Sequence, residues 1–518
     1  MLRAYRTGDV RAAEAPLLEA GEPLMAHAAA AVAHAVIREL RARKITIPGT
    51  SVLLAVGGGN NGGDALYAGS HLAQRGMAVT ALLVGSGAHA AGLAAAQRVG
   101  VRVVSYSEHP QALTELARAT VWIDGLVGIG IHGGLRGAAA EVVTALEEAR
   151  QARAIDPVVV AVDVPSGVSA DDGVVAGPIL HADVTVTMGI AKPGIILDPG
   201  RRFAGRVEVV PLGLEAHLPS EPALISLIDA DVADLWDYPG PDSHKYTRGV
   251  VGLMTGSVAY PGAALLSASA ALAGGAGMVR FAGPRELASI VVQAHPEVVI
   301  APGRVQCWVL GSGIDMEDST ASAEVARRLQ ESIADGFPVV VDAGAIALAG
   351  ETDLPSTVVL TPHPGELSRL LAQRGEPMSR EEIAANPAKA VRLAATLTGA
   401  TVMLKSSVDL VAAPDGPLYV QSGAPAWRAT AGAGDVQAGL LGAMLAAWGD
   451  ELAELGKGRG IPARIAAAAA HLHGHAAALA AGPGVGRPIR ATEIAARLPD
   501  AIGMALTPAP IETLEAEE

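Results

Sequence analysis

Short apolar runs alternate with alanine-rich segments along the whole chain, and this alternation constrains the fold more than any other feature. Runs such as Ser51–Val56, Val121–Val127 and Val158–Val164 are separated by segments with helical composition, for example Asp64–Gln74. Continuous apolar runs between helices are typical of parallel strands whose two faces are both buried. The sequence therefore predicts an α/β fold in which helices cover both faces of a largely parallel sheet.

The second half repeats the pattern, with apolar runs such as Val250–Met254 and Thr401–Leu404 and long helical segments such as Asp435–Trp448. Proline and charge concentrate between Leu212 and Ser243. We therefore expect two three-layer αβα domains, residues 1–220 and 221–507, followed by an acidic tail, residues 508–518. Leu227–Trp236 is expected to form a short helix that introduces the second domain.

Composition excludes several classes of protein. The chain has 518 residues and a net charge of -15, which argues against a nucleic-acid partner. Its apolar stretches are shorter than the ~20 residues that a membrane span needs, and the N-terminus lacks the apolar segment of a signal peptide. Cys307 is the single cysteine, so no intrachain disulfide can form. We expect a cytoplasmic protein without a membrane or nucleic-acid partner.

Two glycine-rich turns end in aspartate. Gly57–Asp64 directly follows the first of these apolar runs, and Ala431–Asp435 opens a helical segment. Backbone N–H groups at such turns can cradle an anion, and the helix dipole adds to the attraction. Two such turns in one chain predict two sites that handle nucleotides.

Two later strands in the first half also end in aspartate. Val121–Ile123 leads into Asp124, and Val160–Val162 leads into Asp163, which is followed closely by Ser166. Carboxyl ends of parallel strands meet at one edge of a sheet, where ligands bind. The spacing Gly128-x-Gly130-x-x-Gly133 formally matches a dinucleotide fingerprint, but it follows an internal strand, which disfavours a hydride-transferring Rossmann domain.

The set Asn-Asn-Gly-Gly-Asp, Asp-x-x-x-Gly-x-Gly and Asp-Val-Pro-Ser-Gly, with Lys192 further on, resembles the NAD(P)HX epimerase family, whose fold is Rossmann-like. These enzymes interconvert the two C6 epimers of hydrated NADH or NADPH. The resemblance implies a potassium ion held by Asn61, Asp124 and Ser166, with Asp163 as the acid/base. It leaves open whether Lys192 binds an anion or closes a loop. The implied substrate-binding residues are Asn60, Asn61, Gly62, Gly63, Asp64, Gly128, Ile129, Gly130, Ile131, His132, Gly133, Gly134 and Asp163.

The second turn, Gly432-Ala433-Gly434-Asp435, resembles that of the ribokinase-like superfamily. Its N–H groups can stabilise a phosphoryl group in transfer, and Asp435 can accept a proton from an attacking hydroxyl. The chain has no Gly-Lys-Ser/Thr loop, which excludes a P-loop NTPase.

Further segments, including His244–Gly249, Thr255–Ala263 and Thr361–Glu366, look like the ADP/ATP-dependent NAD(P)HX dehydratase family. That resemblance implies Mg²⁺ with ADP or ATP. The implied substrate contacts are Ala263, Gly313, His363 and Asp435, and the implied nucleotide contacts are Lys405, Ser406, Ser407, Val408, Asp409 and Gly434. Gly344 and the pair Ser406-Ser407 depart from the family pattern and put metal or nucleotide contacts in doubt.

Together the resemblances predict a bifunctional repair enzyme. Its N-terminal half epimerises NAD(P)HX, and its C-terminal half dehydrates the S epimer through a phosphorylated intermediate. We also expect a homo-oligomer. One alternative is a ribokinase-like vitamin-precursor kinase, and another is an N-terminal domain that only binds a ligand or partner. The sequence does not decide between ADP and ATP.

Two further motifs remain open. His471 and His475 share one helical face, as metal-binding pairs do, but the sequence offers no third ligand with fitting spacing, which favours helix packing. His132 lies within the loop Gly128–Gly134, where substrate contact and simple surface placement are equally compatible with the sequence.

Overall fold

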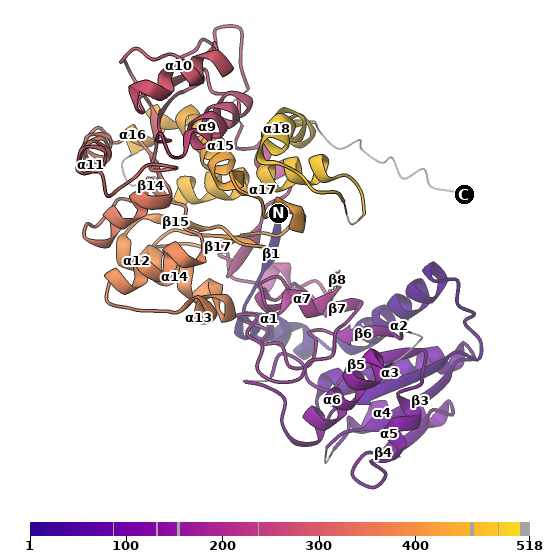
Figure 1. The fold of residues 1–518 in the computed structure, drawn as a ribbon. Coiled ribbons are helices and arrows are strands. Elements are labelled where there is room, and N and C mark those ends of the chain that lie inside the picture. The colour runs from indigo at the N-terminus through magenta and orange to yellow at the C-terminus, as the bar shows by residue number, and fades with distance from the viewer. Residues whose placement is uncertain are drawn as a thin grey trace. The chain divides into compact units, whose positions relative to one another are not determined.

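The computed structural model describes residues 1–85, 87–130, 133–152, 156–236, 238–455, 460–484 and 486–507. The chain divides into two compact units (Figure 1). The N-terminal unit is Arg3–Leu224, and the C-terminal unit is Ile225–Glu518 with Met1–Leu2. Two short strands, β1 (Leu2–Ala4) and β9 (Leu224–Ser226), each contain residues of both units.

The N-terminal unit is built on a seven-stranded sheet in which every neighbouring pair is parallel. Its strand order is β4-β3-β2-β5-β6-β7-β8. The strands are β2 (Ser51–Val56), β3 (Ala78–Leu83), β4 (Arg102–Ser105), β5 (Val121–Gly125), β6 (Val158–Val162), β7 (Val184–Met188) and β8 (Arg206–Val210). The order reverses between β2 and β5, which is the point where open α/β sheets bind ligands.

Helices cover both faces of this sheet. They are α1 (Thr7–Glu19), α2 (Leu24–Ala42), α3 (Asn60–Gln74), α4 (Ala90–Arg98), α5 (Ala112–Leu116), α6 (Gly137–Gln151) and α7 (Arg201–Ala204), with 3₁₀ turns η1 (Pro193–Ile195) and η2 (Glu215–His217). Successive residues of a strand face opposite sides. Leu54 packs with α2 and α3 in one core, whereas Leu53 packs with α5 and α6 in another. This arrangement confirms the predicted three-layer αβα architecture.

The C-terminal unit contains a larger sheet, whose strands β17-β16-β15-β14-β13-β12-β10-β11 lie in that order. Their bounds are β10 (Val250–Met254), β11 (Met278–Phe281), β12 (Cys307–Leu310), β13 (Val339–Val341), β14 (Val358–Leu360), β15 (Thr401–Leu404), β16 (Asp409–Ala412) and β17 (Leu418–Gln421). The pairs from β15 to β11 are parallel, whereas β16 and β17 pair in antiparallel fashion.

Both faces of this second sheet are also covered by helices (Figure 1). Val309 of β12 packs into a core built largely from α9, α15, α17 and α18, while the ring of Trp308, on the opposite face, stacks under Arg328 of α11 at 4.5 Å. The helices are α8 (Asp229–Ala233), α9 (Pro261–Ala273), α10 (Arg285–Ala294), α11 (Ser319–Ala334), α12 (Pro364–Gln373), α13 (Arg380–Ala385), α14 (Pro387–Thr398), α15 (Ala433–Ala447), α16 (Gly449–Leu455), α17 (Ile461–Ala481) and α18 (Ala491–Leu506), with 3₁₀ segments η3 (Ala343–Gly350) and η4 (Ala426–Arg428).

The apolar runs predict most strands closely, and Ser51–Val56 and Thr401–Leu404 have the expected bounds. The antiparallel direction of β16 was not expected. Only four residues join β15 to β16, too few for the crossover that a parallel pair requires. Strands β11 and β17 were also missed, and in β11 the polar Arg280 interrupts the apolar run. The predicted helix Leu227–Trp236 is shorter than expected, since α8 covers only Asp229–Ala233.

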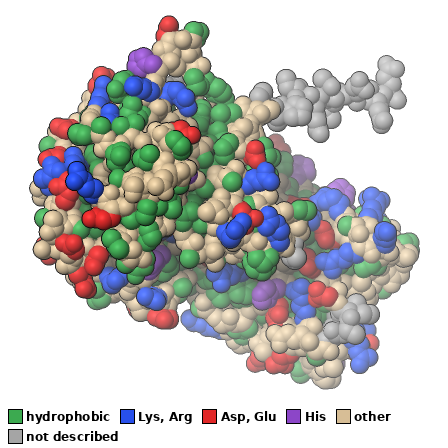
Figure 2. Space-filling model, turned by 45° about the horizontal axis from the view of Figure 1, so that its top comes forward, with side chains coloured by type: hydrophobic (Ala, Val, Ile, Leu, Met, Phe, Trp, Pro, Cys, Tyr) green, Lys and Arg blue, Asp and Glu red, His purple; other side chains and the backbone are tan. Residues whose placement is uncertain are grey.

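On the face drawn in Figure 2, basic and acidic side chains are interspersed and form no broad basic field. Within the described ranges, each helix is either too short or too polar to cross a bilayer.

Candidate functional sites

The first glycine turn brings the backbone of β2 against the loop after β5. A Cβ at Gly57 would lie 1.8 Å from the carbonyl oxygen of Leu126, and one at Gly62 would lie 2.1 Å from that of Gly57. Only glycine fits such close approaches. The packed turn starts α3 at Asn60, so Asn61 and Asp64 lie in its first turns.

Asp124, at the end of β5, is fully buried and holds Ser166. Its two carboxylate oxygens accept hydrogen bonds from the Ser166 hydroxyl at 2.6 Å and the Ser166 backbone N–H at 2.8 Å. The backbone N–H of Leu126 adds a third bond at 3.3 Å. Burial raises the pKa of Asp124, against the lowering effect of these bonds. All three donors are neutral, so a nearby cation would stabilise the ionised carboxylate.

Asn61 reaches across the same sheet edge. Its side-chain N–H donates to the carbonyl oxygen of Val162 at 2.6 Å. A Cβ at Gly128 would lie 2.3 Å from the Asn61 amide oxygen. The glycine of the loop after β5 therefore leaves the space that the Asn61 side chain fills.

Asp163 has a left-handed backbone, with φ of 68°. Lys192 donates to its Oδ1 at 2.5 Å, and Thr187 and the Met188 N–H donate to the same oxygen at 3.1 Å. Lys192 is 1 % exposed. Within the described ranges all donors to this carboxylate bond to Oδ1, which leaves Oδ2 for a ligand. Lys192 thus fixes Asp163, a role that the sequence did not indicate.

A pocket of about 130 Å³ brings together five predicted residues, Asn60, Asn61, Asp64, Ile129 and Asp163. Asp64 is buried, and its Oδ1 has no hydrogen-bond partner among the described residues. Burial, with the charges of Asp163 and Glu14, raises its pKa to about 8. Sequence reasoning missed Glu14, which lines the same pocket from α1 and whose pKa burial also raises. Its helix was not part of any motif.

The other predicted substrate-binding residues of this site that the structure describes are glycines outside the pocket lining. Gly63 packs against His89, and a Cβ at Gly134 would lie 1.5 Å from the carbonyl oxygen of Ala176. Gly133 has φ of 84°, a conformation that glycine adopts freely. Ile131 and His132 lie outside the described residues.

The second turn lies at the start of α15. Gly432 has φ of 87° and precedes the helix, which begins at Ala433. Asp435 occupies the first helical turn. Burial, together with the charge of Asp342, raises its pKa to about 6, while Lys405 acts in the opposite direction. A carboxyl with this pKa is a better proton acceptor near neutral pH than an ordinary aspartate.

Lys405, at the end of β15, connects this turn to the centre of the sheet. A Cβ at Gly434 would lie 3.2 Å from its ammonium nitrogen. The ammonium pairs with Asp342, which also accepts from Thr361 at 2.6 Å and Ser312 at 2.8 Å. Burial opposes ionisation of Asp342, but Lys405 and these hydroxyls together hold its pKa below the ordinary value. Asp342, which precedes the departure at Gly344, therefore positions Lys405.

Asp409, a predicted nucleotide contact, is buried and engaged within the protein. It pairs with Arg428 and accepts from Gln437 at 3.0 Å and the Ser406 N–H at 3.1 Å. The Ser406 hydroxyl bonds to the Val408 carbonyl oxygen. Asp409 thus ties the loop from Lys405 to Val408 to η4 and α15.

Besides Asp435, the predicted substrate contacts of the second site lie at three places in the fold. Ala263 on α9 and Gly313 after β12 are neighbours, since a Cβ at Gly313 would lie 2.6 Å from that of Ala263. His363 caps α12, its Nδ1 accepting from the Gly365 N–H at 2.9 Å. Its side chain is half-exposed, with Nε2 3.4 Å from Glu366.

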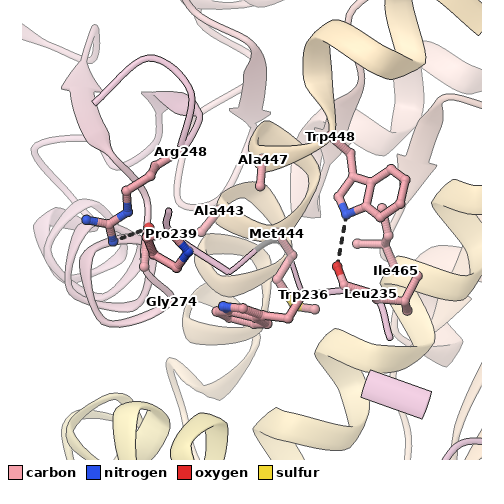
Figure 3. Close-up of a pocket in the computed structure, with 11 residues that line it drawn as sticks. Leu235, Trp236, Pro239, Arg248, Gly274, Ala443, Met444, Ala447, Trp448 and Ile465 are labelled. Atoms are coloured by element: carbon pink, nitrogen blue, oxygen red, sulfur yellow. Dashed lines mark hydrogen bonds between the residues drawn. The ribbon is translucent and has the colours of Figure 1, made fainter. Parts of the chain in front are cut away.

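A separate apolar hollow lies at the other end of α15 (Figure 3). Trp236, Met444 and Trp448 line it, and the Trp448 indole donates to the Leu235 carbonyl oxygen at 3.0 Å. Met444 follows Asp435 by nine residues, or about 14 Å of helix. The hollow contains none of the predicted site residues.

Comparison with known proteins matches each unit to a family. Residues 21–194 match the family described as YjeF-related protein N-terminus, and residues 251–499 match the NAD(P)H-hydrate dehydratase family. Among solved structures, the ADP/ATP-dependent NAD(P)H-hydrate dehydratase of Bacillus subtilis, crystallised with ATP and Mg²⁺, is 24% identical with a TM-score of 0.46. The match covers 54% of this chain and 97% of that one.

Curated relatives span both units. The bifunctional NAD(P)H-hydrate repair enzyme of Mycobacterium tuberculosis is 42% identical over 461 residues, which cover 86% of this chain and 89% of the relative. That of Mycobacterium leprae is 41% identical over 503 residues, which cover 94% and 96%. The NAD(P)H-hydrate epimerase of Clavibacter michiganensis subsp. michiganensis is 45% identical over 216 residues, 41% of this chain and 90% of the relative. The chain therefore belongs to the family of bifunctional NAD(P)H-hydrate repair enzymes.

Proposed function

We propose that the two reactions of this family are divided between the two predicted domains. Residues 1–220 interconvert the R and S epimers of hydrated NADH and NADPH, and residues 221–507 dehydrate the S epimer. The observation that carries this proposal is the presence of two separate constellations, one around Asp163 and one around Asp435, each in its own sheet.

In the first site Asp163 is the acid/base. Inversion at C6 requires a bond at that carbon to break and form again, with a proton given and taken by a fixed group. The contact with Lys192 and the bonds from Thr187 and Met188 hold one carboxylate oxygen, so the other can exchange the proton. Asn60, Asn61, Asp64 and Ile129 line the same pocket and would bind the substrate.

The residues around Asp124 fit a potassium ion. Asn61, Asp124 and Ser166 offer amide, carboxylate and hydroxyl oxygens, which suit a hard cation. The buried Asp124 carboxylate, whose donors in the described part of the chain are all neutral, favours a positive charge there. When bound, potassium would neutralise Asp124 and hold the loop that carries Gly128 against the substrate pocket.

In the second site Asp435 is the base of a phosphoryl transfer. Hydroxide leaves C6 poorly, whereas phosphate leaves readily. Asp435 takes the proton of the C6 hydroxyl, whose oxygen attacks the terminal phosphorus of the nucleotide. The ring nitrogen then expels phosphate, and loss of a proton from C5 restores the dihydropyridine. The backbone N–H groups at Gly434 stabilise the transferred group, and Lys405 supplies a point charge.

Ser406, Ser407, Val408 and Asp409 would shape the nucleotide subsite, and Ala263, Gly313 and His363 the substrate subsite. Mg²⁺ would accompany ADP or ATP and neutralise its phosphates, as in phosphoryl transfer generally. We further propose a homo-oligomer in the cytoplasm. The activity assay, run with ADP and with ATP, also measures which of the two nucleotides the protein prefers.

The test mixes the full chain with both NADHX epimers, Mg²⁺ and ADP or ATP, and follows the absorbance of regenerated NADH. We expect complete recovery. If recovery, corrected for spontaneous epimerisation, stops at the fraction of S epimer in the mixture, the epimerase assignment is wrong. Phosphorylation of a vitamin-precursor alcohol without NADH recovery would favour the kinase alternative.

A further inference from the structure

The structure brings a third side chain to the histidine pair of α17. Asp229, the first residue of α8, lies 2.7 Å from Nε2 of His471 and 3.5 Å from Nδ1 of His475, both measured from its Oδ1. One donor atom from each of the three residues lies within 4.8 Å of the other two. The sequence could not indicate this ligand, because Asp229 precedes His471 by 242 residues.

The surroundings of His471 orient its ring as in a metal site. Its Nδ1 faces the amide oxygen of Gln421, at the end of β17, at 3.3 Å. In the tautomer whose Nδ1 donates to this oxygen, Nε2 carries the lone pair. Metal-binding histidines are oriented by such a partner on the second nitrogen. The lone pair of Nε2 then faces a carboxylate oxygen at hydrogen-bond distance, so a proton or a metal ion must lie between them.

The spacing of the three donors suits a small divalent ion. Ligands about 2.0–2.2 Å from a tetrahedral zinc ion lie about 3.3 Å from one another. The distance from Asp229 to His475 is already close to this value, and the distance from Asp229 to His471 needs to open by about 0.6 Å. Each of the three side chains is partly buried, so solvent can reach a fourth position.

We propose that Asp229, His471 and His475 form a binding site for a divalent transition-metal ion of the zinc class. A set of two imidazoles and one carboxylate binds zinc and other divalent transition-metal ions in preference to Mg²⁺. The ion joins α8 to α17 and, through Gln421, to β17, so its binding stabilises the C-terminal unit. The site is separate from the proposed catalytic groups and does not depend on the reaction.

The experiment uses tag-free full-length protein that has been stripped of metal with a chelator. ZnCl₂ is titrated in by calorimetry, and CoCl₂ is added in parallel so that visible absorption reports nitrogen and oxygen ligands. The variants are His475→Gln and Asp229→Asn, and recovery of NADH from (S)-NADHX checks their fold. The control is His34→Gln, which removes a histidine from a surface hollow shared with His71 in the N-terminal unit.

We expect one strong zinc site in the unaltered protein, weakened at least about tenfold by either variant and unchanged by the control. Zinc should also raise the unfolding temperature of the unaltered protein but not that of His475→Gln. Equal zinc affinity in His475→Gln and the unaltered protein, or no zinc binding at all, would overturn the proposal. Neither result would bear on the proposed repair activity, which is measured separately.

Discussion

The contact between Gly128 and Asn61 allows a sharp test of the first site, because a neighbouring glycine provides a matched control. A Cβ at Gly128 would lie 2.3 Å from the Asn61 amide oxygen, about 1 Å short of the 3.4 Å at which ordinary contact begins. A Cβ at Gly130 would lie 3.5 Å from the Arg11 guanidinium, which is an ordinary contact. Gly128→Ala must therefore displace Asn61, whereas Gly130→Ala displaces no residue that the structure describes.

Two costs follow from displacing Asn61. Overpacking of this kind costs about 1–3 kcal/mol of stability. Loss of the hydrogen bond to the Val162 carbonyl oxygen adds about 0.5–1.5 kcal/mol. A shift of about 1 Å in a positioning group reduces a rate by about 100-fold, so we expect Gly128→Ala to lose about that much epimerase activity. Gly130→Ala should stay within a few-fold of the unaltered protein.

The assay follows conversion of (R)-NADHX to the S epimer by chromatography, with KCl replaced stepwise by choline chloride. Potassium should activate the unaltered protein and Gly130→Ala, whereas it should activate Gly128→Ala much less. Urea unfolding separates lost stability from lost function. If Gly128→Ala kept the full rate and the full potassium response, the assigned role of Asn61 would be wrong.

Three further predictions concern single carboxylates or their partners. Asp435→Asn should reduce dehydration of (S)-NADHX by about 10²–10⁴-fold without affecting epimerisation, and an unchanged dehydration rate in this variant would remove Asp435 as the base. In the unaltered protein kcat/KM for dehydration should fall as the pH drops below about 6, where Asp435 becomes protonated. Burial raises the pKa of Asp64 to about 8, so between about pH 4 and 8 the unfolded state binds fewer protons than the folded state, and stability declines as pH rises. Asp64→Asn should flatten this decline when urea unfolding is measured across the pH range, and an unaltered dependence of stability on pH would contradict the raised pKa of Asp64. Lys192→Met leaves Asp163 buried without its cation and should destabilise the N-terminal unit by about 3–5 kcal/mol by the same measurement, whereas a stability loss below about 1 kcal/mol would show that the pair is dispensable.

The sequence predicted the architecture well because burial on both faces leaves a clear apolar signal. Strands such as Ser51–Val56 and Val184–Met188 have no exposed face and were located closely. Strand β11 was missed, because Arg280 interrupts its short apolar run. The antiparallel pairing of β16 follows from the short loop after Lys405, a constraint that apolar patterning does not contain.

The glycine turns and strand ends could be located from the sequence, because backbone geometry at these places depends on local sequence. Contacts made by distant side chains were not accessible in this way. Glu14 reaches the first pocket from a helix without a motif, and Asp229 reaches the α17 histidines from far along the chain. Asp409, a predicted nucleotide contact, also bonds to Arg428 and Gln437, and the sequence did not indicate these partners.

The central claim is that one chain holds two independent active sites that act in sequence on one damaged dinucleotide. Its most direct test compares Asp163→Asn, Asp435→Asn and their equimolar mixture on mixed NADHX epimers with Mg²⁺ and the preferred nucleotide. We predict that Asp163→Asn stops at the S fraction, that Asp435→Asn regenerates no NADH, and that the mixture recovers all of it. Failure of the mixture to exceed Asp163→Asn alone, with both variants folded, would contradict the claim.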